Sequence, residues 1–222
     1  MKTAALIPAW NNAEDIASVI KGCKGWADTV LVVDDGSTDR TAQLAKEAGA
    51  QVVVHPRNRG KGEGLRTGIV RLRGKADFIV MIDADMQYNP ADAPDLLQPL
   101  MDGSADIVMG ARNWSEVPLR HRLGNWVWRT EFNLLFGAKF SDTNCGFMAM
   151  TSAAAEKVRF HGGYIIESGI LADAVRYGLK AENVPVKVTY RHPSKVPRGL
   201  RMVAGVLIFI LTEGLRWRLR KR

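Results

Sequence analysis

Residues 78–87 read Phe78-Ile79-Val80-Met81-Ile82-Asp83-Ala84-Asp85-Met86-Gln87, an apolar run followed by two acids. A short apolar run of this kind is typical of a strand in a parallel sheet that is covered by helices. Residues i and i+2 of a strand point the same way, so the carboxylates of Asp83 and Asp85 can converge on one cation. The stretch therefore predicts a buried strand that delivers two acids to a ligand site.

The pattern around this stretch alternates short β-branched runs with helical stretches. It predicts an α/β fold, a mostly parallel sheet with helices on both faces. We expect strands at Ala4–Ile7, Thr29–Val33, Gln51–Val54, Phe78–Ile82, Ile107–Met109, Gly146–Met150 and Val184–Tyr190. We expect helices at Ala13–Cys23, Thr38–Ala48, Gly62–Leu72, Ala91–Met101 and Gly169–Tyr177, and an amphipathic segment over Arg120–Phe136.

Length and composition set the class of protein. The chain has 222 residues, 46% of them hydrophobic and 24% charged, which fits one globular α/β domain and excludes a disordered or fibrous protein. Its two cysteines and four scattered histidines lack the spacing of a disulfide framework or a zinc site. The chain opens directly into a predicted strand, so we expect a cytoplasmic protein.

The net charge of +8 lies in the last 34 residues. Residues 189–222 hold nine Lys and Arg against Glu213 alone, whereas residues 1–188 hold 22 residues of each sign. The uncharged run Met202–Thr212 is too short to span a bilayer, which takes about 20 residues. We expect a peripheral helix at the inner face of the membrane, with Trp217 at headgroup level; a packed helix or a dimer contact is the alternative. The predicted division is an enzyme domain over residues 1–195 and a membrane-associating helix over residues 196–222.

Polar clusters follow five of the predicted strands, at the edge where parallel strands place a ligand crevice. The clusters are Pro8–Asn11, Asp34–Ser37, Arg57–Gly62, Asp83–Asp85 and Gly110–Arg112. Five such clusters at five carboxyl ends indicate a ligand-binding enzyme.

The residue types in these clusters point to a metal and a nucleotide. Asp83 and Asp85, with Gln87 as a third oxygen ligand, suit Mg²⁺ or Mn²⁺, which take few carboxylates and complete their shell with water and phosphate. One acid of the pair Asp34 and Asp35 can accept a hydrogen bond from a nucleobase or ribose while the other caps a helix. Lys61 lies in a glycine-rich loop that lacks the ending of a P-loop, and either contacts a phosphate or is a solvated lysine.

Together these blocks resemble the family 2 (GT-A type) glycosyltransferases, and within them the dolichol-phosphate mannose synthase-like branch. The resemblance covers about residues 3–195. Its blocks are Pro8–Asn11, Val32–Asp39, Asn58–Gly62, Ile82–Gln87 and Asp142–Phe147, with a weaker continuation through Glu167 to Val184-Pro185 and Arg191…Ser194-Lys195. The order of the double-Asp block and the Asp-x-Asp-x-Gln block is the specific part.

The resemblance implies a Rossmann-like GT-A fold and a role for each matching residue. The nucleotide of a GDP- or UDP-sugar donor would lie against Pro8, Trp10, Asn12, Asp34, Asp35, Lys61, Asp83 and Ala84. The metal on the diphosphate would be held by Asp83, Asp85 and Gln87, and the catalytic residues would be Asp85 and Asp142. Phosphate groups of the acceptor would meet Arg112, Arg191 and Lys195. The chain departs from the family at Asn12, where Glu is usual, and at Met148, where Arg is frequent.

The reaction that this resemblance implies is an inverting transfer of a hexosyl group onto a polyprenyl phosphate, in the making of cell-envelope glycans. A soluble or glycan hydroxyl is the alternative acceptor, with Asp142 as general base. A nucleic-acid-binding protein that uses the basic tail is a remote alternative, because the body is neutral and the tail offers only Trp217 and Tyr190 for stacking. The expected partners are therefore the donor, a lipid phosphate and a membrane surface, without nucleic acid.

Overall fold

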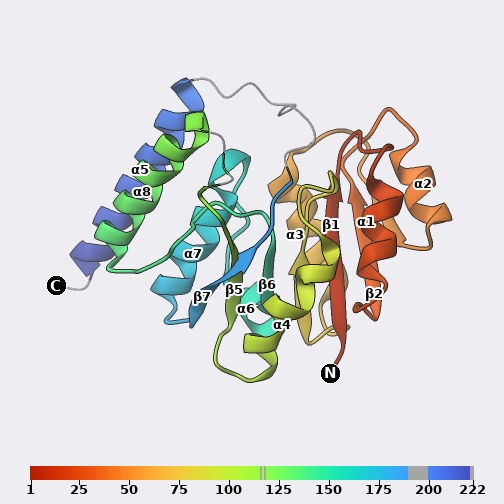
Figure 1. The fold of residues 1–222 in the computed structure, drawn as a ribbon, viewed down its shortest axis with the longest axis horizontal. Helices are drawn as coiled ribbons and strands as arrows, with labels where there is room; N and C mark the ends of the chain where they lie inside the picture. The colour runs from red at the N-terminus through yellow and green to blue at the C-terminus, as the bar shows by residue number, and fades with distance from the viewer. Residues whose placement is uncertain (116, 118, 190–199, 221–222) are drawn as a thin grey trace.

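The computed structural model describes residues 1–115, 117, 119–189 and 200–220, and within them the chain forms a seven-stranded sheet between layers of helices (Figure 1). The strands are β1 (Thr3–Ala9), β2 (Thr29–Asp34), β3 (Gln51–Val54), β4 (Phe78–Met81), β5 (Ile107–Arg112), β6 (Met148–Thr151) and β7 (Ala181–Val186). The α-helices are α1 (Ile16–Cys23), α2 (Thr41–Glu47), α3 (Lys61–Leu72), α4 (Ala93–Met101), α5 (Leu119–Phe136), α6 (Ser152–Lys157), α7 (Ile166–Arg176) and α8 (Leu200–Arg220). Two 3-10 turns, η1 (Pro90–Asp92) and η2 (Gly163–Ile165), lead into α4 and α7.

The strands lie in the order β3-β2-β1-β4-β6-β5-β7. Neighbours run parallel except at β6, which is antiparallel to β4 and to β5. The predicted mostly parallel α/β sheet is thereby confirmed. From β1 the chain builds outward to β2 and β3, then crosses to β4 on the other side of β1. In sheets of this kind the crevice beside such a reversal is where ligands bind.

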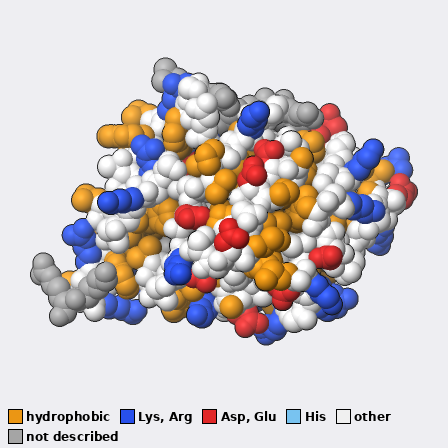
Figure 2. Space-filling model, turned by 60° about the horizontal axis from the view of Figure 1, so that its bottom comes forward, with side chains coloured by type: hydrophobic (Ala, Val, Ile, Leu, Met, Phe, Trp, Pro, Cys, Tyr) orange, Lys and Arg blue, Asp and Glu red, His pale blue; other side chains and the backbone are white. Residues whose placement is uncertain are grey.

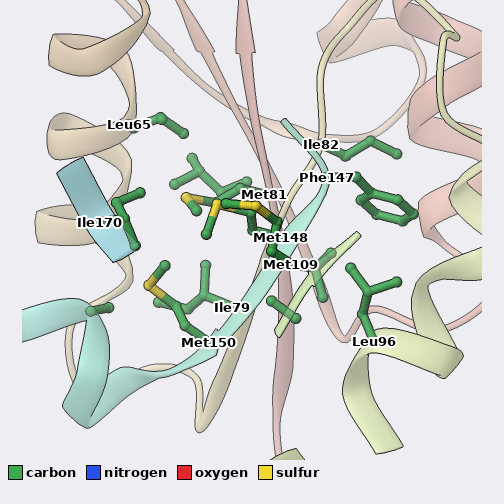
Figure 3. Close-up of a cluster of buried hydrophobic side chains, with 14 of the residues drawn as sticks. Leu65, Ile79, Met81, Ile82, Leu96, Met109, Phe147, Met148, Met150 and Ile170 are labelled. Atoms are coloured by element: carbon green, nitrogen blue, oxygen red, sulfur yellow. The ribbon is translucent and has the colours of Figure 1, made fainter. Parts of the chain in front are cut away.

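The central strands are buried on both faces. Every residue of β1 and β4 is buried. Leu65 of α3 and Ile170 of α7 cover one face of the sheet, and Leu96 of α4 covers the other (Figure 3). Burial of each such aliphatic side chain contributes about 1.5–3 kcal/mol. The apolar run therefore ends at the sheet edge, and the chain presents its acids there.

Several predicted elements have other bounds in the structure: α1 begins at Ile16 instead of Ala13, and α7 begins at Ile166 instead of Gly169. The last strand covers Ala181–Val186 instead of Val184–Tyr190, because it pairs in register with β5 from Ile107 to Arg112; residue 190 lies outside the described residues. Helix α2 begins at Thr41 instead of Thr38. The Asp39 carboxylate accepts a hydrogen bond from the Thr41 backbone N–H at 2.9 Å, so residue 39 belongs to the turn that precedes the helix.

Helices α5 and α8 lie side by side on α7 (Figure 1). Val206 and Ile210 of α8 are buried in the main core, and a Cβ on Gly214 would lie 2.5 Å from Leu135 Cβ, so the two helices are closely packed. Arg218 donates to the Leu135 carbonyl at 3.1 Å, at the C-terminus of α5, where a cation is favoured by the helix dipole. None of the described helices combines the length and apolar content that a bilayer crossing requires. The predicted division at residue 195 falls outside the described residues and stays a prediction.

Two glycines predict opposite effects for the same substitution. A Cβ on Gly62, in the first turn of α3, would collide with the His161 carbonyl, whereas a Cβ on Gly124, in α5, meets nothing within 4 Å. We expect Gly62→Ala to destabilise the fold by about 1–3 kcal/mol through overpacking. We expect Gly124→Ala to stabilise it by up to about 1 kcal/mol through helix propensity. Urea titration measures both, and a stable Gly62→Ala protein would contradict the close approach of α3 to residue 161.

Candidate active site

The predicted site residues that the structure describes gather at one edge of the sheet, because the carboxyl ends of β1, β2, β4 and β5 meet there. Antiparallel β6 adds a further segment. Its first residue, Met148, pairs with Met81 at the end of β4, so the preceding loop, Asp142–Phe147, begins at the same edge. The fold thus assembles the site from the carboxyl ends of parallel strands and the start of one antiparallel strand.

Lys61, Asp83 and Glu167 form an ion cluster at this edge. Lys61 Nζ lies 2.7 Å from Asp83 Oδ1 and 3.1 Å from Glu167 Oε1. Burial opposes the charge on Lys61, but Asp83 and then Glu167 hold the pKa of this lysine above its ordinary value. Lys61 is therefore a paired cation and not a solvated loop residue. Gly146 leaves room for the cluster, since a Cβ there would collide with Asp83 Oδ2.

The chemistry around Asp83 and Asp85 fits a divalent metal. Burial raises the pKa of Asp85, and the negative charge of Asp83 raises it further, so this pair of acids favours a bound cation. Asp85 Oδ1 accepts a hydrogen bond from the Gln87 backbone N–H at 3.1 Å, while Ala84 between the acids is buried. No group of three His, Cys, Asp or Glu side chains among the described residues is placed to hold a metal. Two carboxylates completed by substrate phosphate are the usual arrangement for Mg²⁺.

The adjacent acids Asp34 and Asp35 have different environments. The Asp35 carboxylate, 3% exposed, accepts from the backbone N–H groups of Arg59 at 2.9 Å and Gly60 at 2.7 Å, and lies 2.7 Å from His55 Nδ1. Asp35 thereby ties the end of β2 to the loop before α3. Asp34 Oδ2 accepts from the backbone N–H of Ser37, but its Oδ1 is buried without a hydrogen-bond partner among the described residues. Asp34 therefore keeps a buried acceptor that no described residue satisfies.

The loop after β1 carries the remaining candidate nucleotide contacts. Pro8 lies within buried β1, whereas Trp10 is 42% exposed at its end and offers an aromatic face. Asn12 Oδ1 accepts from the Trp10 backbone N–H at 3.0 Å, and the Asn12 backbone N–H donates to Thr41 Oγ1 at 2.8 Å. The Asn12 side chain therefore shapes its own loop in this structure.

Asp142 and Arg112 form a buried two-point ion pair. Arg112 Nε lies 2.7 Å from Asp142 Oδ2, and Nη2 lies 2.9 Å from Oδ1. The Asn144 backbone N–H also donates to Asp142, which is 1% exposed. Both oxygens of Asp142 are engaged, and the Arg112 guanidinium also packs over Trp114 at 5.3 Å. Their predicted roles, as catalytic residue and as phosphate contact, stay predictions.

The other predicted acceptor contacts are not placed at the site. Arg191 and Lys195 lie outside the described residues. Met148, where the family often has Arg, is 1% exposed and packs in the core (Figure 3). A charge at this position would be buried in apolar surroundings.

Sequence reasoning missed two partners. His55 directly follows β3, at a carboxyl end, and that position could have marked it as a site residue; it bridges Asp35 and Thr67. Glu167, which the resemblance includes without a role, approaches Lys61 from the first turn of α7, and no spacing in the sequence predicts this contact between residues 106 apart.

Comparison with known proteins supports one family. The family model for glycosyl transferase family 2 matches residues 4–159. The chain is 28% identical to UDP-N-acetylglucosamine--dolichyl-phosphate N-acetylglucosaminyltransferase from Methanococcus voltae over 92% of each protein. It is 32% identical to dolichol-phosphate mannosyltransferase from Pyrococcus furiosus over 50% of this chain and 33% of that protein.

The fold has relatives among solved structures. Glucosyl-3-phosphoglycerate synthase from Mycobacterium tuberculosis, in complex with Mn²⁺, UDP-glucose and phosphoglyceric acid, matches with a TM-score of 0.69 at 25% identity. The match covers 97% of this chain and 79% of that one. From its sheet, its site and these likenesses, the chain is a hexosyltransferase that belongs to glycosyl transferase family 2, on the dolichol-phosphate mannose synthase-like branch.

Proposed function

We propose that this enzyme transfers a hexosyl group from a UDP-sugar to the phosphate of a polyprenyl lipid, with inversion and with Mg²⁺ or Mn²⁺ on Asp83, Asp85 and Gln87. The proposal depends on one observation. Asp83 and Asp85 follow the buried strand β4, next to the point where the strand order changes direction, and Lys61 lies 2.7 Å from Asp83. The donor class is supported by the Methanococcus voltae relative, whose name includes UDP-N-acetylglucosamine, and by the solved complex with UDP-glucose.

On the donor side, the chain supplies contacts along the nucleotide. Trp10 offers an exposed ring for the base, and the buried Asp34 Oδ1, which no described residue satisfies, accepts from the base or ribose once it is uncovered. Lys61 begins α3 and neutralises phosphate charge. When bound, the metal adds electrostatic stabilisation of the charge that develops on the departing diphosphate. Asp35 holds the loops on either side of the donor together.

On the acceptor side, the engagement of Asp142 favours a phosphate over a hydroxyl. A hydroxyl acceptor needs a base to take its proton, and both oxygens of Asp142 are held by Arg112 and a backbone N–H. A phosphate monoester has a second pKa near ~6 and is already an anionic nucleophile at neutral pH. Two relatives are named for dolichyl-phosphate substrates, which agrees with this choice.

The surface of α5 and α8 supports contact with the inner, cytoplasmic face of a membrane. Leu211, Leu215 and Leu219 of α8 are 44–72% exposed, on the side opposite buried Val206 and Ile210. Helix α5 adds three exposed apolar side chains, Leu123, Trp126 and Leu134. Figure 2 shows apolar and basic side chains interleaved over this part of the molecule. Apolar burial combined with basic charge supplies the two signals that stable peripheral attachment takes.

The acceptor is identified by measuring whether radiolabelled product partitions into organic solvent or stays in the aqueous phase. With radiolabelled UDP-glucose or UDP-N-acetylglucosamine, Mn²⁺ and a polyprenyl phosphate, we expect the label to enter organic solvent. The matched reaction uses the corresponding polyprenol, which lacks the phosphate, and we expect no product there. Label that stays aqueous and appears on a soluble hydroxyl would replace the lipid phosphate by the alternative acceptor.

The variant Asp85→Asn removes the negative charge of this side chain and keeps its size. We expect it to abolish transfer, because the metal loses a carboxylate, yet to raise the melting temperature of the metal-free protein at pH 7. The pKa of Asp85 is higher in the folded protein than in the unfolded chain. An ionised Asp85 therefore destabilises the fold at pH values above its folded-state pKa. Thermal melts in chelator at pH 7 and pH 4 measure the effect, which should shrink toward pH 4. Each kcal/mol regained corresponds to about 2–4 °C. A lower melting temperature at pH 7 would contradict it.

The membrane surface is tested by substitutions that leave the core intact. Truncation of α8 would uncover Val206 and Ile210, so we choose the triple variant Leu211→Ser, Leu215→Ser and Leu219→Ser. We expect its recovery with anionic liposomes to fall at least about tenfold, since each buried leucine contributes about 1.5–3 kcal/mol. The matched control replaces Val54, Val70 and Met101, which are exposed elsewhere, with Ser. Equal losses in both variants, or none in the first, would remove the membrane from the proposal.

A further inference from the structure

Lys61 occupies a place on Asp83 that a metal would need. Its ammonium lies 2.7 Å from Asp83 Oδ1. A divalent ion bonds carboxylate oxygen at about 2.0–2.1 Å and repels an ammonium that shares the oxygen. In this arrangement Lys61 and a metal would compete for Asp83 Oδ1.

Glu167 gives Lys61 a second partner. Its Oε1 lies 3.1 Å from Lys61 Nζ, and its side chain is 13% exposed. Removing a partner from a half-buried charge is strongly unfavourable unless another group takes over. With Glu167 in contact, Lys61 can leave Asp83 and keep an ion pair. The four-carbon stem of lysine allows such a movement without a shift of the backbone.

We propose that Lys61 is a resident counter-ion that keeps the metal off Asp83 until the donor diphosphate draws the lysine away, so that metal and donor bind together. This inference rests on the proposed function, because it assigns an order of binding to the same site. The diphosphate attracts Lys61 by its charge, and the freed Asp83 oxygen then accepts the metal. Since coupling between two ligands is reciprocal, UDP strengthens metal binding by the same factor as the metal strengthens UDP binding.

The experiment measures Mn²⁺ binding to the full chain by calorimetry, without nucleotide and with saturating UDP. In the wild type we expect weak binding alone and at least tenfold tighter binding with UDP. In Lys61→Met we expect Mn²⁺ alone to bind at least tenfold tighter than in the wild type. We expect the effect of UDP to be smaller than in the wild type, with only the part that comes from phosphate ligands on the metal left. In Glu167→Gln we expect weaker binding than in the wild type, because Lys61 then depends on Asp83.

Arg59→Gln is the matched control. It removes the same charge two residues away, but Arg59 pairs with Glu63 at 3.0 Å and has no contact with Asp83. We expect its Mn²⁺ affinity to stay within about twofold of the wild type. An equal gain in this variant would assign the effect to net charge and overturn the inference.

The outcomes separate the inference from the function on which it rests. If the wild type binds Mn²⁺ with UDP but Lys61→Met does not bind Mn²⁺ more tightly alone, the counter-ion role is wrong and the metal site stands. If the wild type binds no Mn²⁺ even with UDP, the proposed function fails and the inference with it. Should Lys61→Met not fold, Glu167→Gln decides: an affinity for Mn²⁺ equal to or above that of the wild type overturns the inference.

Discussion

The insertion of β6 between β4 and β5, in the opposite direction to both, is the constraint on which the site depends. A parallel strand in that place would begin at the far edge of the sheet and would carry residues 142–147 away from Asp83. Because β6 begins where β4 ends, Met148 pairs with Met81, and Gly146 lies against the Asp83 carboxylate. The site is thus a product of strand direction as much as of residue type.

The acids at this edge differ in how their charge is compensated. Asp83 is paired with Lys61, Asp142 with Arg112, and Asp35 with backbone N–H groups and His55. Among the described residues Asp85 forms no ion pair, and burial together with the charge of Asp83 raises its pKa. Compensated acids fix loops and side chains in place, whereas an uncompensated acid favours an incoming cation. The aspartates at this edge therefore fall into two groups: those that hold the structure of the site and those that can bind a ligand.

The sequence predicts what local pattern controls. The positions of the first five strands, the α/β class and the placement of the acids at carboxyl ends follow from periodicity and from residues next to one another, and they agree with the structure. The place of β6, the pairing of Glu167 with Lys61, and the difference between Asp34 and Asp35 do not follow, because each depends on contacts between distant segments. Helix α8 is predicted only in part. Its apolar run is visible in the sequence, but contacts with α5 and α7 determine which of its faces is buried in the core.

Helix α8 is joined to α7 by more than apolar packing. Glu213 lies 2.6 Å from Arg176 of α7, and Arg176 also contacts buried Asp173. The first turn of α7 carries Glu167, the partner of Lys61. Helix α7 therefore connects the outer pair of helices, α5 and α8, to the donor site, and its length is fixed. If the proposed membrane contact is made through α5 and α8, the length of α7 would set the height of the donor site above the lipid surface.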